Sequence, residues 1–96
     1  MTIIKIYSFV GAFAENKDTA RDIRIKKIMP LLKAGKNVIL DFKNVDSATQ
    51  SFVHALLSEL IRAYGSEVID KLTFKNCSIT VQKMITIVID YMQEGM

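Results

Sequence analysis

The spacing of hydrophobic residues divides the chain into alternating strand-like and helix-like segments. Residues 2–9 are rich in Ile and aromatic residues and predict a strand that ends at Gly11. Residues 38–42 form a short apolar run that is typical of a central strand covered on both faces. Residues 71–76 alternate like a strand nearer an edge. Helices are predicted over residues 18–32, 48–64 and 79–92.

The three predicted helices differ in the quality of their apolar faces. The helix over residues 48–64 is the clearest, because its apolar residues recur at i, i+3, i+4 and i+7. The first helix has a ragged face, and Pro30 lacks the amide hydrogen that would bond to the carbonyl of Lys26. We therefore expect a kink or break near Met29. The last helix has a wide apolar arc, which indicates deep packing or half of an interface.

The order of the segments, β-α-β-α-β-α, predicts the fold class. Strands that alternate with helices imply right-handed crossovers and a largely parallel sheet. We expect a small α/β domain with three helices and a mostly parallel, mixed sheet of three or four strands. With 96 residues, half of them hydrophobic, and no linker-like stretch, the chain is interpreted as one domain over residues 1–96.

Positive charge gathers in one part of the chain, although the formal net charge is only +3. Seven of the thirteen Lys and Arg residues lie between residues 17 and 36, and five of them form the candidate patch: Lys17, Arg21, Arg24, Lys26 and Lys27. Such a run is either a solvated helix face or a patch for nucleic acid or an acidic protein. No aromatic residue interleaves with these charges to stack on bases, which disfavours nucleic acid while leaving it open.

The sequence offers little material for catalysis or metal binding. His54 is the only histidine and has no neighbouring cysteine, so no metal site is predicted. Cys77 is the only cysteine, which fits a reducing cytoplasm, and it is expected to be a small buried residue rather than a nucleophile. The glycines are too isolated for a phosphate-binding loop, and no apolar run reaches the roughly 20 residues of a membrane span. We expect a cytoplasmic protein that is not an enzyme and has no cofactor.

Two polar residues stand at the ends of predicted strands. Asp41 is expected to cap the following loop at the amide of Asn44 or Val45. An Asp at the carboxyl end of a parallel strand can also line a functional crevice. Asn76 ends the next strand and is expected to bond to the local backbone.

The start of the predicted second helix carries the most informative polar residues. The sequence Ser-Ala-Thr-Gln over residues 47–50 fits a capping box, in which Ser47 and Gln50 bond to each other's amides. Ser51 would then lie in the first turn and point outward. On the side of this helix opposite the apolar stripe, polar residues recur with the helical period. They form either an ordinary solvated surface or a docking face, and they are Gln50, Ser51, His54, Ser58 and Arg62.

Several short motifs, in this order, resemble a bacterial STAS-like domain family of unknown function. They are the Val-Ile-Leu-Asp-Phe run at residues 38–42, then Val45, then Ser51 and Phe52 opening a helix, and residues 74–78 before the last helix. The segment from Lys17 to Ile23 is more loosely similar to the first helix of that family. The resemblance implies an α/β STAS-like fold.

The better-known STAS antagonists of anti-sigma factors are similar to the chain in one feature, a Val-Ile-Leu-Asp strand followed by a loop and a polar helix start. In those antagonists a partner kinase phosphorylates a Ser in the helix start, and the phosphate disrupts the complex. The resemblance implies phosphorylation candidates at Ser51 and Thr49, although Gln50 stands at the equivalent position. It also implies a docking surface for a histidine-kinase-like ATPase or another switch protein, made by Asp46, Gln50, Ser51, His54 and Ser58.

Three functions remain open from the sequence. The first is a non-catalytic regulatory module that binds another protein through this surface. The second is a binder of nucleic acid or an acidic surface that uses the basic first helix. The third is an inhibitor from a mobile element that uses the same fold. A homodimer is a further alternative, because short sheets leave edges and the last helix is very apolar.

Overall fold

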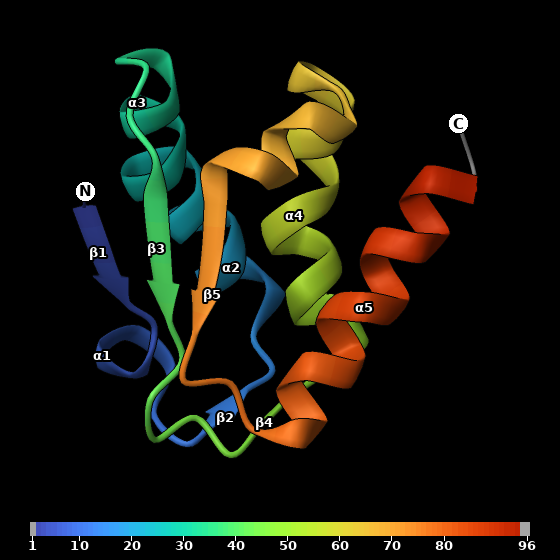
Figure 1. Ribbon diagram of the computed structural model, residues 1–96. Helices are drawn as coiled ribbons and strands as arrows, with labels where there is room; N and C mark the ends of the chain where they lie inside the picture. The colour runs from blue at the N-terminus through green and yellow to red at the C-terminus, as the bar shows by residue number, and fades with distance from the viewer. Residues whose placement is uncertain (1, 95–96) are drawn as a thin grey trace.

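The computed structural model describes residues 2–94, in which strands and helices alternate as the sequence predicts (Figure 1). The elements are β1 (Thr2–Lys5), α1 (Tyr7–Val10), β2 (Phe13–Ala14), α2 (Lys17–Ile23), a π-helical turn η1 (Arg24–Ile28), α3 (Met29–Lys33), β3 (Val38–Asp41), β4 (Ser47–Ala48), α4 (Gln50–Tyr64), a 3₁₀ turn η2 (Ser66–Lys71), β5 (Leu72–Lys75) and α5 (Ile79–Glu94). The α/β class is confirmed. None of the helices described is long and apolar enough to cross a membrane.

All strand pairs in the described residues are parallel. The main sheet has the order β1-β3-β5, and its register places Ile3 beside Ile39 and Ile39 beside Thr73. β2 and β4 form a separate two-stranded ladder, with Phe13 opposite Ser47. Helical segments join the strands of the main sheet, as parallel pairing requires. β5 is an edge strand, as the alternation in its sequence indicates.

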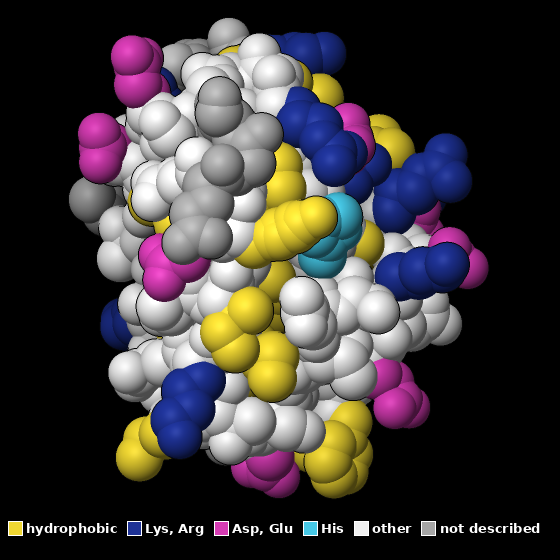
Figure 2. Space-filling model, turned by 90° about the vertical axis from the view of Figure 1, so that its right-hand side faces the viewer, with side chains coloured by type: hydrophobic (Ala, Val, Ile, Leu, Met, Phe, Trp, Pro, Cys, Tyr) yellow, Lys and Arg dark blue, Asp and Glu magenta, His cyan; other side chains and the backbone are white. Residues whose placement is uncertain are grey.

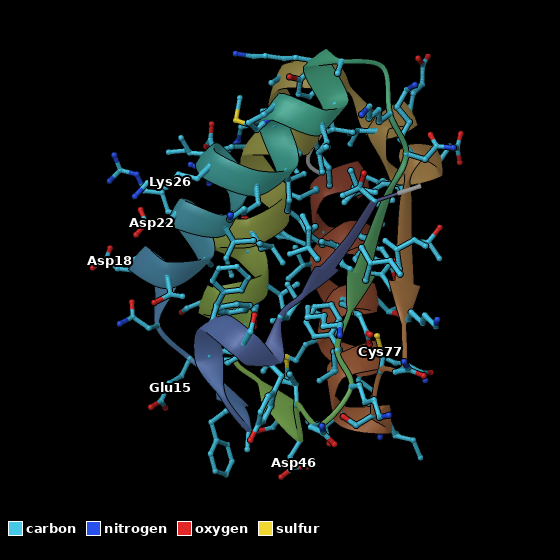
Figure 3. All side chains as sticks on the ribbon, turned by 90° about the vertical axis from the view of Figure 1, so that its left-hand side faces the viewer. Glu15, Asp18, Asp22, Lys26, Asp46 and Cys77 are labelled. Carbon is cyan, nitrogen blue, oxygen red and sulfur yellow. The ribbon has the colours of Figure 1, made fainter. Side chains whose placement is uncertain are left out.

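The helices cover only one face of the main sheet (Figure 1, Figure 3). On the covered face, Ile4 and Leu40 are buried against the helices. On the other face Ile3 is 48% exposed and Thr73 is also exposed. The prediction that the central strand is covered on both faces is therefore wrong, because the helices after β1, β3 and β5 all return on the same side.

The first strand is shorter than predicted. The amide of Ile6 still donates to the carbonyl of Asp41, at 2.9 Å, but the chain then turns through α1. The hydroxyl of Ser8 donates to the carbonyl of Lys5, at 2.7 Å, and fixes this turn. Gly11 ends α1 with a φ of 70°, a conformation that favours glycine.

The helical segment from Lys17 to Lys33 passes the proline without breaking. Asn16 caps its start, because its side-chain oxygen accepts hydrogen bonds from the amides of Asp18 and Thr19. At the predicted kink or break near Met29, the regular α-helix is interrupted by the π-turn η1, in which the amide of Met29 bonds to the carbonyl of Arg24. A wider turn just before Pro30 accommodates a residue that cannot donate to the preceding turn.

α4 forms the centre of the hydrophobic core. It packs against α2 on one side and α5 on the other. Its core side chains are 0–1% exposed: Phe52, Val53, Leu56, Leu57, Leu60 and Ile61. This confirms the apolar stripe that the sequence predicts, and it leaves the opposite side of α4 facing outward between its two neighbours.

Candidate docking surface

α4 begins two residues later than predicted, with Thr49 as its N-cap. The Thr49 hydroxyl oxygen accepts a hydrogen bond from the amide of Phe52, at 3.1 Å. Ser47 lies in β4, and the amide of Thr49 donates to the carbonyl of Ala14, at 2.9 Å. The predicted Ser47–Gln50 capping box is therefore wrong, because pairing with β2 holds the chain extended until Thr49.

Three of the five predicted docking residues line one hollow on the molecule. Gln50 and Ser51 come from the first turn of α4, and His54 lies one turn further along. The hollow has a volume of 490 Å³, and its other lining residues are Lys17 from α2, Ala55 from α4, and Val88 and Tyr91 from α5. The structure thus brings the starts of α2 and α4 together with the second half of α5.

His54 and Tyr91 join α4 to α5 across this hollow. Their rings meet edge to face, with the ring centroids 6.3 Å apart and an interplanar angle of 89°. Tyr91 is 56% exposed, so it is accessible to a partner. Figure 2 shows the histidine beside a run of hydrophobic side chains, with Lys and Arg side chains gathered on its other side. Tyr91 is not among the predicted site residues, because its only signal in the sequence is an aromatic residue beside the apolar stripe of α5.

A second hollow of 550 Å³ continues along α4 from His54 and Ala55. Its remaining lining residues are Arg24, Ile25, Met29, Ser58, Glu59, Arg62 and Ala63. Arg62 forms an exposed ion pair with Glu59, a kind of contact that adds little to stability. The two hollows share His54 and Ala55, and together they are termed the α4 groove.

Ser58 lines the second hollow but exposes little of its own surface. It is 2% exposed, although the helical period places it in line with Ser51 and His54. α2 packs across α4, and the guanidinium of Arg24 donates to the carbonyl of Ala55. Ser58 therefore offers little surface to a partner in the folded chain, and its role in docking stays a prediction.

Asp46 lies apart from the α4 groove, in the loop before β4. It is exposed, and Figure 3 shows it at one end of the molecule. Its amide donates to the carbonyl of Ala12, at 2.8 Å, and its carbonyl accepts from the hydroxyl of Ser78, at 2.9 Å. These two bonds to the main chain of Asp46 connect three loops, while the Asp46 side chain does not line either hollow.

The five residues of the predicted basic patch do not form one surface. Lys17 and Arg24 border the α4 groove, whereas Lys26 and Lys27 border a different groove beside β1. Arg21 is exposed and lines neither groove. Arg24 is partly buried, and within residues 2–94 its Nε atom has no hydrogen-bond partner. Positive charge is thus divided between two sides of the first helical segment.

Asp41 ties together the loops at the carboxyl ends of β3 and β5. Its carboxylate accepts from the amide of Lys43, at 2.9 Å, and from the side-chain amide of Asn76, at 3.0 Å. These two bonds, the Asn76 bond first, hold the pKa of Asp41 below its usual range. Asp41 caps the following loop as predicted, but it accepts from the amide of Lys43 instead of from that of Asn44 or Val45. Asn76 bonds to the side chain of Asp41, whereas a bond to the local backbone was predicted.

Cys77 follows this cluster and is half-buried. Burial raises the pKa of its thiol, and the nearby charge of Asp41 adds to the effect. At neutral pH the thiol is therefore protonated, which is the less reactive form. Within residues 2–94, no group of three His, Cys, Asp or Glu side chains is arranged to hold a metal ion.

Comparison with known proteins identifies a family model that matches the chain. Residues 19–82, about two thirds of the chain, match the STAS-like domain of unknown function (DUF4325). The match begins in α2 and ends in the first turn of α5, so it covers α4 and most of the α4 groove. Searches of curated proteins and of solved structures gave no significant match.

Proposed function

The chain belongs to a STAS-like domain family of unknown function, and from this premise we propose that it is a regulatory module that binds another protein. The binding surface in this proposal is the α4 groove, and the chain performs no catalysis. The observation that carries the proposal is the exposed Tyr91 ring, held against His54 over a hollow that Ser51 lines. Ser51 and His54 come from α4 and Tyr91 comes from α5, so the three meet only in the folded chain.

The chemistry of the groove suits a protein partner. Tyr is enriched among residues that dominate binding energy, because its ring buries a large apolar area at small entropic cost. Ala55 and Val88 supply an apolar lining beside Tyr91, and Gln50 supplies a polar rim. An apolar centre with a polar rim is the usual anatomy of a protein interface.

Ser51 gives the proposed interface a switch. It is exposed in the first turn of α4, and Lys17 lines the same hollow. A phosphate on Ser51 would be stabilised by the positive end of the helix dipole and attracted by Lys17. It would occupy the hollow and block the partner while leaving the fold intact. The Thr49 hydroxyl already caps the helix, which makes Ser51 the better candidate.

The partner class that the family resemblance implies is a histidine-kinase-like ATPase or another switch protein. An inhibitor from a mobile element would use the same groove against a different target. The identity of the bound protein separates these two roles. A role in binding nucleic acid has less support, because the basic residues divide between two grooves.

The test is affinity purification from source cells, read by quantitative mass spectrometry. The baits are wild type, Tyr91→Ala and Ser51→Glu, with Tyr64→Ala as the matched control. Tyr64 is also an exposed tyrosine, but it does not line the groove. We expect a protein that is retained by wild type and Tyr64→Ala and lost from the other two. Identical sets of proteins on all four baits would reject the proposal.

A further inference from the structure

The outer edge of β1 presents unpaired main-chain groups. β1 is the first strand in the order β1-β3-β5, so only one of its sides is paired. The bond from the amide of Ile6 to Asp41 shows that the even-numbered residues of β1 face β3. Because the main-chain groups of successive residues point to alternate sides of a strand, those of Ile3 and Lys5 point away from β3. The carbonyl of Lys5 takes the Ser8 hydroxyl, which leaves both groups of Ile3 and the amide of Lys5 unpaired within residues 2–94.

A groove of 520 Å³ runs beside this edge. α1 supplies one wall through Ser8 and Phe9, and η1 and α3 supply the other through residues that include Pro30 and Leu31. Ile3 is 48% exposed and Phe9 is 43% exposed, so apolar surface accompanies the free main-chain groups. Figure 1 shows β1 at the margin of the sheet, with α1 at one end. The groove can therefore take both the backbone and the apolar side chains of an extended segment.

The charge of the groove has one sign. The charged residues among its lining are Lys5, Lys26 and Lys27, and no Asp or Glu lines it. Asp22 lies one helical turn before Lys26 on the outside of the helical layer (Figure 3) and is not part of the groove. An acidic segment would complement this charge. A second copy of the chain paired edge to edge through β1 would instead bring two sets of lysines together, which is unfavourable.

We propose that the free edge of β1 and the groove beside it bind an extended acidic segment of a partner protein as an added strand. Such a segment uses all three features of the site. Its backbone pairs with Ile3 and Lys5, alternate apolar side chains contact Ile3 and Phe9, and its carboxylates face the lysines. A nucleic acid would use only the positive charge. This edge is a separate surface from the α4 groove, so the proposal does not depend on the proposed function.

The experiment is an NMR titration of the ¹⁵N-labelled full chain with the acetylated, amidated peptide Glu-Val-Glu-Val-Glu-Val. We expect saturable shifts at the amides of Ile3 and Lys5 that weaken as salt is raised. Two control peptides are titrated in the same way. In the first, every Glu is replaced by Lys; in the second, every internal amide nitrogen carries a methyl group. Equal binding of either control would overturn the proposal, and so would the absence of saturable shifts with the acidic peptide.

Two pairs of variants separate strand addition from simple charge attraction. Ile3→Pro removes an outward amide without removing a bond to β3, and we expect affinity for the peptide to fall about five- to tenfold, with Ile3→Val as control. The double variant Lys26→Glu/Lys27→Glu should bind the peptide about tenfold more weakly than wild type. Lys33→Glu with Lys36→Glu makes the same charge change outside the groove and should have a smaller effect.

Nucleic acid and self-association are the remaining outcomes. A six-nucleotide dT oligomer that binds more tightly than the peptide, and is insensitive to Ile3→Pro, would overturn the proposal in favour of a nucleic-acid patch. A dimer in sedimentation velocity that Ile3→Pro dissociates would overturn it in favour of edge pairing between copies. If Ile3→Pro does not fold, the methylated peptide tests the same hydrogen bonds on the wild-type chain.

Discussion

The side-chain amide of Asn76 donates a hydrogen bond to the carboxylate of Asp41, at 3.0 Å, across 35 positions of the sequence. Asp41 ends the central strand β3, and Asn76 follows the last residue of β5 with a φ of 58°. The bond joins two loops at one end of the sheet. It also makes the carboxylate part of the stability of the fold, which leads to the first prediction.

We predict that Asp41 contributes stability that is lost in acid. Its pKa is lowered in the folded chain, so its contribution is present above the unfolded pKa of about 3.9 and is lost as the pH falls through the folded pKa. Asp41→Asn should flatten the dependence of the denaturant midpoint on pH between about pH 4 and pH 2. Asn76→Ala removes the main cause of the lowered pKa and should have a similar, smaller effect. Parallel curves for wild type and Asp41→Asn would contradict this assignment.

The cap of α4 gives a second prediction. Thr49→Ala removes the hydroxyl that accepts from Phe52, and it should lower the free energy of unfolding by about 1 kcal/mol. Ser47→Ala is the matched control, because Ser47 lies in β4 and caps nothing; its effect should stay within about 0.5 kcal/mol. Urea unfolding of the two variants measures both values. A larger loss for Ser47→Ala would restore the capping box that the sequence suggests.

Two serines that one helical period places in line, Ser51 and Ser58, should differ sharply in how much stability the same change to Glu costs. Ser51 is exposed near the start of α4, so Ser51→Glu should change stability by less than about 0.5 kcal/mol. Ser58 is 2% exposed, so Ser58→Glu buries a charge and should cost about 3 kcal/mol or more. Ser58→Ala controls for loss of the hydroxyl, and thermal unfolding compares the three. Equal effects of the two Glu variants would contradict the burial of Ser58.

Cys77 gives a fourth prediction, about reactivity. Burial and the charge of Asp41 raise the pKa of its thiol, so the thiolate is a small fraction at neutral pH. Alkylation of Cys77 by iodoacetamide should be slower than alkylation of a cysteine peptide. The rate should rise with pH, and the rise should occur at higher pH than it does for the peptide. Asp41→Asn should move the profile toward lower pH. Folded protein and peptide reacting at the same rate across the pH range would contradict this account.

Much of the fold could be predicted from local patterns. The periodicity of α4 and α5 and the alternation in β5 report directly on which side chains face the core. The parallel order of the sheet follows from strands that alternate with helices. Such patterns succeed where each segment buries one face along its own length, because the sequence then repeats the geometry of the element.

The errors arise where one segment depends on another. Ser47 has the sequence of a helix cap, but it pairs with Phe13 in a ladder that no local pattern indicates. Ser58 lies on the polar side of α4, but the packing of neighbouring helical segments leaves it 2% exposed. Tyr91 gains its place beside His54 only when α5 packs on α4. The candidate site was therefore predicted in its α4 half and missed in its α5 half.

The most direct test of the central claim is the affinity of the purified partner for Tyr91→Ala compared with Tyr64→Ala, measured by isothermal titration calorimetry. We predict that Tyr91→Ala raises Kd at least about tenfold, because Tyr91 is the aromatic anchor of the groove, while Tyr64→Ala stays within about twofold of wild type. Thermal unfolding of both variants confirms that they are folded. A Kd for Tyr91→Ala equal to that of wild type would show that the partner does not bind in the α4 groove.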